Sequence, residues 1–148
     1  MINKVKVFVQ HNRYQNFENP TRRVAKETLR ILKKEGLVLE INLVDSRRMR
    51  FLNKKFRGKN VATNVLSFEG MRKGEFFEPG ISLEKGWRDL GEIYLNPGYI
   101  LKQKEDLGRM VIHGILHLLG YQHDKKDDTI RMEKLEKSLK GLIRVGFS

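Results

Sequence analysis

The amino-acid sequence predicts a single α+β domain over residues 1–148, with about four helices packed on a mixed sheet of about four strands. The chain length suits one domain with its own core. Apolar residues make up 39% of the chain, which is enough for a globular protein. Short runs with a period of two alternate with longer runs that have helical spacing, in the order β-α-β-α-β-β-α-α, which indicates helices packed on a mixed sheet.

The first half of the chain has the periods and capping residues of alternating strands and helices. Asn19 followed by Pro20 is a helix start, because Asn caps and Pro suits the first turn, and Gly36 is expected to stop this helix. Asp45 is expected to cap the next helix. The elements predicted here are a strand at 4–9, a helix from 19 to about 34, a strand at 38–44, a helix from 45 to about 56 and a strand at 64–68.

The second half is predicted to form one more strand and two longer helices. Asn96 and Pro97 repeat the cap-and-proline signal, and Gly120 is expected to end the helix that they begin. The elements predicted here are a long loop at 70–89, a strand at 90–95, a helix from 97 to 119 and a helix at about 128–144. Helix residues expected to face the core include Phe51, Phe56, Ile130, Leu135, Leu139 and Leu142.

Charge and cysteine content narrow the classes of function. The net charge of +12, from 30 basic and 18 acidic residues, attracts polyanions and favours a nucleic-acid partner over a purely solubilising role. The absence of cysteine excludes disulfides, thiolate metal sites and a cysteine nucleophile. No apolar run reaches the roughly 20 residues of a membrane helix, and the first residues do not resemble a signal peptide, so we expect a cytoplasmic protein without a membrane partner.

Three of the four histidines lie within eleven positions, at His113, His117 and His123. Residues four apart stack on one face of a helix, so His113 and His117 can share one metal ion. Gly120 can turn the chain back, which lets His123 approach the same point from beyond the helix end. Three histidines without a fourth protein ligand are typical of a catalytic zinc, so we expect one Zn²⁺ per chain at the C-terminal end of this helix. Another divalent transition metal suits imidazole too.

The same histidine spacing occurs in metzincin proteases, whose second motif position is the glutamate that acts as general base. This chain has Gly114 at that position, so peptide hydrolysis by that route is not expected. From its size alone, Gly114 is predicted to leave open space beside the metal for a phosphate.

A basic segment without any acidic residue covers positions 47–59. A solvated helix face explains most such runs, but phosphate binding explains the single sign of the charge better. Arg57 is distinct because it ends the helix beside Gly58, where its planar guanidinium can offer two donors to a phosphate. The other candidate RNA-binding residues are Arg47, Arg48, Arg50, Lys54, Lys55 and Lys59.

These motifs together resemble the YbeY family of bacterial endoribonucleases. The segment 113–123 (HGILHLLGYQH) is similar to the family's H-G-x-L-H-L-x-G-Y-D-H signature, and 52–68 (LNKKFRGKNVATNVLSF) resembles its L-N-x-x-[YWF]-R-x-K segment and the T-[DN]-V-L-S-F that follows. Leu90-Gly91-Glu92-Ile93 resembles its L-G-D-I strand, and Met132-Glu133 with Glu136 fits its last helix. The departures are Gln122 and Glu92, each for the usual Asp, and Ala62 for the usual Pro.

The resemblance implies a single-strand-specific, metal-dependent endoribonuclease that matures ribosomal RNA, chiefly that of the small subunit, and takes part in ribosome quality control. It implies zinc on His113, His117 and His123, with Arg57 and His117 as catalytic residues. It also implies a ribosomal context, in which the ribosome or small-subunit ribosomal proteins are partners.

Two mechanisms and two rival functions stay open at this point. Zinc can lower the pKa of bound water to about 7, or polarise the scissile phosphate while the RNA 2′-hydroxyl attacks. Glu92 and Asp89 are general-acid candidates only by elimination. The rivals are a non-catalytic RNA-binding ribosome assembly factor whose metal stabilises the fold, and a metal-dependent hydrolase of another substrate.

Overall fold

The computed structural model describes residues 2–70, 86–121 and 125–143. Within these ranges one sheet has the strand order β1-β2-β4-β3. Its strands β1, β2 and β4 are mutually parallel, and β3 pairs antiparallel with β4, which confirms the predicted mixed sheet. The strands are β1 (Lys4–Val9), β2 (Leu37–Leu43), β3 (Val65–Glu69) and β4 (Arg88–Leu95).

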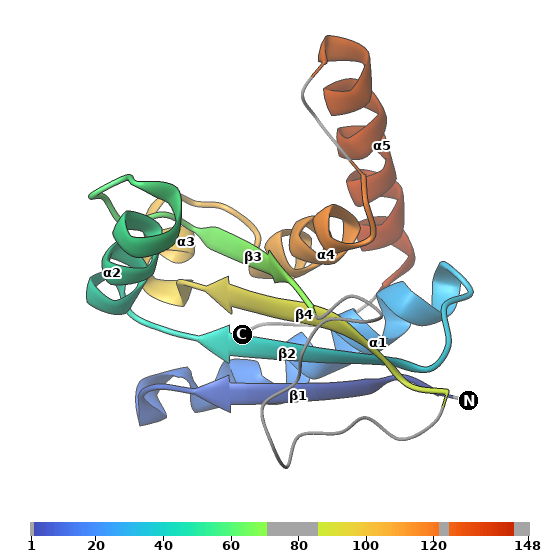
Figure 1. The fold of residues 1–148 in the computed structure, drawn as a ribbon, viewed down its shortest axis with the longest axis horizontal. Coiled ribbons are helices and arrows are strands. Elements are labelled where there is room, and N and C mark those ends of the chain that lie inside the picture. Colours follow the sequence, from blue (N-terminus) through green and yellow to red (C-terminus); the bar gives the residue numbers. More distant parts are fainter. Residues whose placement is uncertain (1, 71–85, 122–124, 144–148) are drawn as a thin grey trace.

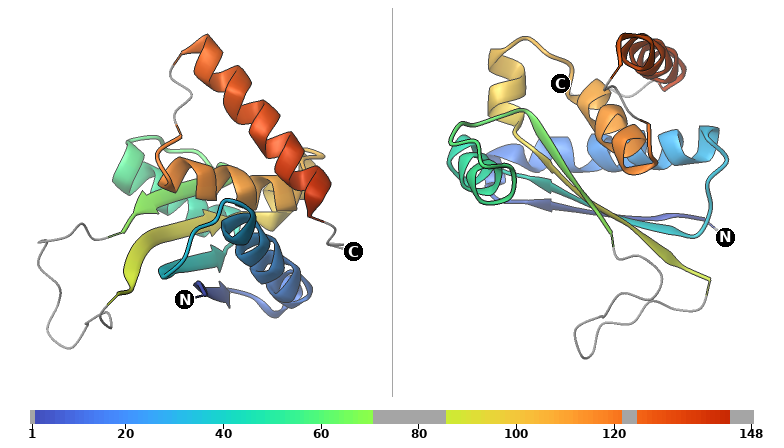
Figure 2. Two further views of the ribbon diagram at one scale, coloured as in Figure 1. Left: turned by 90° about the vertical axis from the view of Figure 1, so that its right-hand side faces the viewer. Right: turned by 45° about the horizontal axis from the view of Figure 1, so that its top comes forward.

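Helices cover the sheet in layers (Figure 1). The helical elements of the described residues are the 3₁₀-helix η1 (Asn12–Phe17) and the α-helices α1 (Glu18–Ile31), α2 (Ser46–Arg57), α3 (Pro97–Lys102), α4 (Leu107–Leu118) and α5 (Lys126–Leu142). Figure 2 shows α1 and α4 lying over the same face of the sheet, with α5 packed against α4 further from the strands. None of these helices is long and apolar enough to cross a membrane. The α+β prediction is thus confirmed (Figure 1).

The two faces of the sheet have different neighbours. Alternate residues of the strands join the main core, which α1 and α4 complete on one face. On the other face, Met49 and Leu52 of α2 pack with Leu66 of β3, and Phe68 and Tyr94 lie against this second cluster. The sheet therefore separates α2 from α4, and the side chains of β3 and β4 point alternately toward one helix or the other.

The first helix begins and ends earlier than predicted. The prediction of Asn19 as N-cap is wrong, because η1 leads directly into a helix that starts at Glu18. The Asn19 side chain instead accepts a hydrogen bond from Arg22, at 2.7 Å. Lys33, at φ 57°, is the first left-handed residue after the helix, so the chain leaves the helical path before Gly36.

The helix predicted from 97 to 119 is two helices, α3 and α4. Lys104 adopts a left-handed conformation, at φ 57°, and breaks the continuous path. Asp106 then caps α4 by accepting a hydrogen bond from the Arg109 main-chain N–H. The prediction from the cap-and-proline signal is confirmed at Asn96, whose side chain accepts from the Tyr99 N–H. The second cap, at Asp106, was not predicted.

Four residues that were expected to face the core are exposed instead. Phe51 and Phe56 are each 52% exposed, and Ile130 and Leu142 are 41% and 67% exposed. Phe56 lies edge-on against Phe68 of β3, which is an edge strand of the sheet that the described residues form. Leu139 is buried and Leu135 partly buried, as predicted. Most of the predicted loop, residues 71–85, lies outside the described residues.

Candidate active site

Helix α4 holds His113 and His117 on the side that the core leaves open. Its apolar residues Val111, Ile112 and Ile115 are fully buried in the main core. His113 is half-buried, and His117, one turn further along, is exposed. Because the buried stripe fixes the rotation of the helix, both imidazoles are carried on one face of a rigid element.

The helix ends just before Gly120, as the sequence predicted. Gly120 has φ +98°, and its N–H donates to the His117 carbonyl at 3.1 Å. The Tyr121 N–H donates to the Leu116 carbonyl at 3.0 Å, which closes the helix end. The third predicted ligand, His123, lies outside the described residues.

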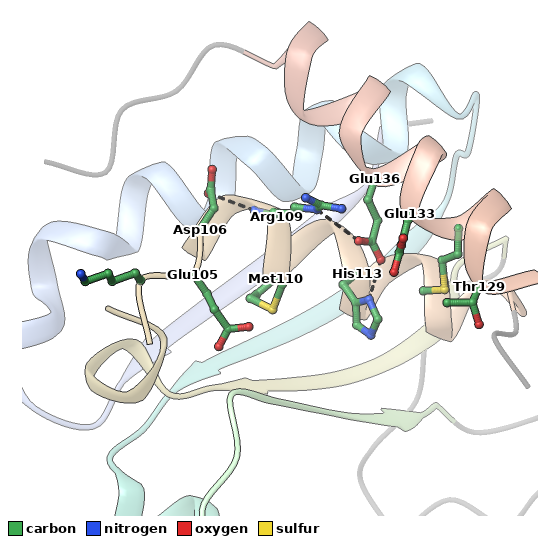
Figure 3. Close-up of a pocket in the computed structure, with 10 residues that line it drawn as sticks. Glu105, Asp106, Arg109, Met110, His113, Thr129, Glu133 and Glu136 are labelled. Atoms are coloured by element: carbon green, nitrogen blue, oxygen red, sulfur yellow. Dashed lines mark hydrogen bonds and ion pairs between the residues drawn. The ribbon is translucent and has the colours of Figure 1, made fainter. Parts of the chain in front are cut away.

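A buried carboxylate on α5 orients the His113 ring (Figure 3). Glu136 is 4% exposed, and its Oε1 lies 2.5 Å from His113 Nδ1. The Arg109 Nε donates to the other oxygen of this carboxylate at 3.4 Å. Since a carboxylate oxygen accepts in this bond, Nδ1 is the donor, and in the neutral imidazole the ring lone pair is then on Nε2. This is the tautomer of a metal-binding histidine held by an outer carboxylate, so the donor set fits a metal ion.

The role of Glu136 was not predicted, although its position in the sequence carries a signal. Met132 and Leu139 are buried at the positions four before and three after it, so Glu136 stands in the apolar stripe of α5. A carboxylate at such a position needs a partner on the facing element, and that partner is His113. An acidic residue in an otherwise apolar stripe therefore indicates a site residue.

A cavity of about 600 Å³ lies between α4, α5 and the segment before α4 (Figure 3). Its charged lining includes two bases, Lys104 and Arg109, and more acids than bases. The acids are Glu105, Asp106, Glu133 and Glu136. Acidic side chains do not attract phosphates, so most phosphates of an RNA strand are expected to contact basic residues outside this cavity.

The prediction of open space at Gly114 is wrong. Gly114 is buried, and a Cβ there would lie 3.0 Å from Ile93 Cδ1 and 3.2 Å from Ser67 Oγ. The glycine lets α4 pack closely on β3 and β4. A glutamate at this position would not fit, which supports the exclusion of the metzincin route.

Arg57 reaches β3 from α2, on the other side from α4. Gly58, at φ +71°, ends the helix as predicted. The Arg57 Nη2 donates to the Ser67 carbonyl at 2.9 Å, and its guanidinium lies 5.0 Å from the centre of the Phe68 ring. Ser67 Oγ donates in turn to the Gly114 carbonyl at 3.4 Å. Two hydrogen bonds through one residue of β3 thus connect Arg57 to the helix that carries the histidines.

The two carboxylates that were general-acid candidates both belong to β4, and Glu92 points away from α4. Glu92 accepts a hydrogen bond from Tyr94 OH at 3.0 Å, on the face opposite to Ile93 and therefore opposite to α4. Partial burial and the charge of Glu40 raise the pKa of Glu92. Glu40 is the residue of β2 that pairs with Glu92. Asp89 accepts from the Gly91 N–H near the start of β4. Glu92 therefore lies on the face of the sheet that carries Phe68 and Arg57, and not on the face that α4 covers.

The remaining predicted RNA-binding residues lie on α2 or directly after it, and all are exposed. They are Arg47, Arg48, Arg50, Lys54, Lys55 and Lys59. Asp45 caps this helix as predicted, because its side chain accepts from the Arg48 N–H at 2.9 Å. The structure thus presents one exposed, positively charged helix on the side of β3 opposite to the histidine helix.

Similarity to known proteins identifies the class. The sequence profile described as Endoribonuclease YbeY matches residues 4–142. The chain therefore belongs to a family whose members are named endoribonucleases. A relative named Endoribonuclease YbeY from Bartonella quintana is 35% identical over 129 residues, which cover 80% of this chain and 77% of that protein. The chain belongs to the YbeY family, as its motifs predicted.

Two further relatives of the same name differ in length from this chain. That of Myxococcus xanthus is 33% identical over 94% of this chain, which covers 48% of that protein. That of Thermodesulfovibrio yellowstonii is 38% identical over 70% of this chain, which covers 65% of that protein. The solution structure of TM1509 from Thermotoga maritima has a TM-score of 0.51 and 21% identity, covering 93% of this chain and 90% of that one, and supports the fold.

Proposed function

We propose that this protein is a zinc-dependent, single-strand-specific endoribonuclease that acts in the cytoplasm on ribosomal RNA. Its substrate would be chiefly small-subunit RNA, during ribosome maturation and quality control, with the ribosome or small-subunit ribosomal proteins as partners. Membership of the YbeY family over residues 4–142 and the net charge of +12 support an RNA substrate.

The observation that carries the proposal is the Glu136 carboxylate on His113 Nδ1. A buried glutamate in this position is typical of a metal site. It fixes the tautomer and the orientation of the imidazole that binds the metal. The proposed ligands are His113, His117 and His123. Within residues 2–70, 86–121 and 125–143 no three His, Asp or Glu side chains form a metal-holding group, so the proposed site requires His123.

A zinc ion bound there supplies Lewis-acid chemistry for phosphodiester cleavage. Arg57, which is exposed, directs its guanidinium donors to a non-bridging phosphate oxygen and stabilises negative charge as it develops. The stack on Phe68 and the bond to Ser67 hold the guanidinium in place at the edge of β3. The cations of α2 hold the neighbouring phosphates.

The test measures zinc content and cleavage on the full chain and on His117→Ala, with single-stranded RNA, single-stranded DNA and a peptide as substrates. We expect about one zinc per wild-type chain, cleavage of RNA alone, and loss of both zinc and cleavage in the variant. His11→Ala is the matched control, because His11 is bonded to Asp45 at 2.7 Å and should leave zinc and cleavage intact.

Two other results separate the rival functions. Zinc without any RNA cleavage rejects the enzyme and leaves a metal-stabilised RNA-binding assembly factor. Cleavage of DNA or peptide in preference to RNA indicates a metal-dependent hydrolase of another substrate. Cleavage that persists after the zinc has been fully removed indicates a contaminating nuclease and favours neither the enzyme nor the assembly factor.

A further inference from the structure

Two phenylalanines of α2 expose far more surface than folding requires. Phe51 and Phe56 are each 52% exposed, although the chain folds with α2 anchored by the buried Met49 and Leu52. Large aromatic rings exposed together on one short helix are uncommon unless they meet a ligand or a partner.

Cations lie against both rings. The Lys55 Nζ is 5.9 Å from the centre of Phe51 and 5.3 Å from the centre of Phe56. The Arg48 guanidinium is 5.3 Å from the centre of Phe51. Each ring is thus bordered by a positive charge on the same exposed helix, which is the composition of surfaces that bind single-stranded nucleic acid: rings for bases and cations for phosphates.

The positive charge around Phe51 and Phe56 indicates which kind of ligand the rings bind. Residues 47–59 carry seven basic residues and no acidic one, so an uncharged apolar partner would leave this charge without a counterpart. A chain of phosphates with unpaired bases satisfies both the rings and the charges.

The rings also lead toward the proposed catalytic arginine. Phe56 meets Phe68 edge-on, with centroids 5.2 Å apart, and Arg57 lies over the same Phe68 ring. Phe51 precedes Phe56 by five helical residues, a rise of about 7.5 Å with about 140° of rotation about the helix axis, so the two rings leave α2 in different directions. The two rings can therefore take separate bases of one strand whose phosphate reaches Arg57.

We propose that Phe51 and Phe56, flanked by Arg48 and Lys55, form a platform on which bases of single-stranded RNA stack next to Arg57. This inference rests on the proposed function and adds the residues that select unpaired RNA. A duplex keeps its bases stacked inside and cannot use the rings, so the platform favours single strands.

The experiment compares two oligonucleotides of equal length, one of adenosine ribonucleotides and one of abasic ribose phosphates. Binding is measured by fluorescence anisotropy on the full chain carrying His117→Ala, so that RNA is not cut. Adding Phe51→Ala or Phe56→Ala should weaken binding to the adenosine oligonucleotide at least about fivefold and leave abasic binding unchanged. Phe51→Trp should restore the affinity, which excludes loss of folding as the cause.

Phe8→Ala is the matched control, since Phe8 is 51% exposed on β1, at the other edge of the sheet from β3. It should bind both oligonucleotides as the parent chain does. Lys55→Gln should instead weaken both equally and lower the salt dependence of binding by about one phosphate contact.

Unchanged binding of the adenosine oligonucleotide in both phenylalanine variants would reject the proposed platform. The exposed rings would then indicate a protein partner. An equal loss on both oligonucleotides would reject the platform too, because bases would then not be involved. In either case wild-type cleavage of RNA would stand. Failure of the wild-type chain to cut RNA would reject the proposed function instead, so the two failures are distinguishable.

Discussion

Helices α2 and α4 are built from the same local signals and differ in what surrounds them. Each has 12 residues, and each begins at an aspartate whose side chain accepts the main-chain N–H three residues on. Each is followed by a glycine with positive φ, Gly58 or Gly120. Their capping and length therefore do not explain their different roles.

The difference lies in burial. Seven residues of α4 are buried, and they pack between the sheet, α1 and α5, whereas α2 buries three. A helix fixed on several sides can hold imidazoles in a constant orientation, as metal binding requires. A helix that is mostly exposed can present cations and rings that adapt to a flexible strand of RNA. Rigid placement and adaptable contact are thus divided between two helices on opposite sides of β3.

Arg57→Ala should have the largest effect and tests whether α2 and α4 have separate functions. If α2 supplies charge stabilisation and α4 the metal, turnover on RNA should fall about 100- to 1000-fold while zinc content stays constant. The measurement is single-turnover cleavage together with zinc analysis. Arg50→Ala is the control, because Arg50 is bonded to Asn60 at 2.8 Å and should affect binding more than turnover. A parallel fall of zinc and activity would contradict the division.

Glu136→Gln tests whether α5 keeps the α4 imidazole in place. Losing the charge that orients His113 should reduce zinc affinity about 10- to 100-fold, measured by competition with a chelating dye. Glu133→Gln is the matched control, since Glu133 lines the same cavity from the same helix but is exposed. Equal zinc affinity in the wild type and Glu136→Gln would show that His113 needs no outer carboxylate.

Gly114→Ala tests the close packing of α4 on the sheet. The added methyl would meet Ile93, which is fully buried, at 3.0 Å, so we expect a loss of about 1–3 kcal/mol in the free energy of unfolding by urea. Gly141→Ala on α5 has nothing within 4 Å of the added Cβ and should instead gain about 0.5–1 kcal/mol. Undiminished stability of Gly114→Ala would mean that α4 is less tightly held than proposed.

Asp45→Ala tests the anchoring of α2 and should have the smallest effect, about 1 kcal/mol at neutral pH. The Arg48 N–H and then His11 hold the pKa of Asp45 below its usual value. A lowered folded-state pKa means that this stabilisation is present above about pH 4 and is lost as the pH falls through the folded pKa. The difference between wild type and variant in urea unfolding should therefore shrink on acidification, and a pH-independent difference would contradict this account.

Much of the fold was predictable from local patterns. The period of two located all four strands to within two residues at each end, and Asp45 and Gly120 acted as predicted. The errors occurred where a neighbouring element overrode a local signal. Asn19 lost its capping role to the 3₁₀-helix before it, and the break at Lys104 divided a helix that its apolar pattern suggested was continuous.

The candidate site shows the same division. The spacing of His113 and His117 and the turn at Gly120 follow from helical geometry, and His123 is inferred from the same spacing. By itself the sequence thus determined the fold class, the family motifs, the histidine pair and the basic segment, because each depends on residues close in the chain. Only the tertiary structure decided that Glu136 is hydrogen-bonded to His113 and that Ile93 fills the space beside Gly114. It also decided that Glu92 faces away from α4 and that Phe51 is exposed. Those facts depend on which face of one element packs against another, and contacts between distant segments are not encoded in local periodicity.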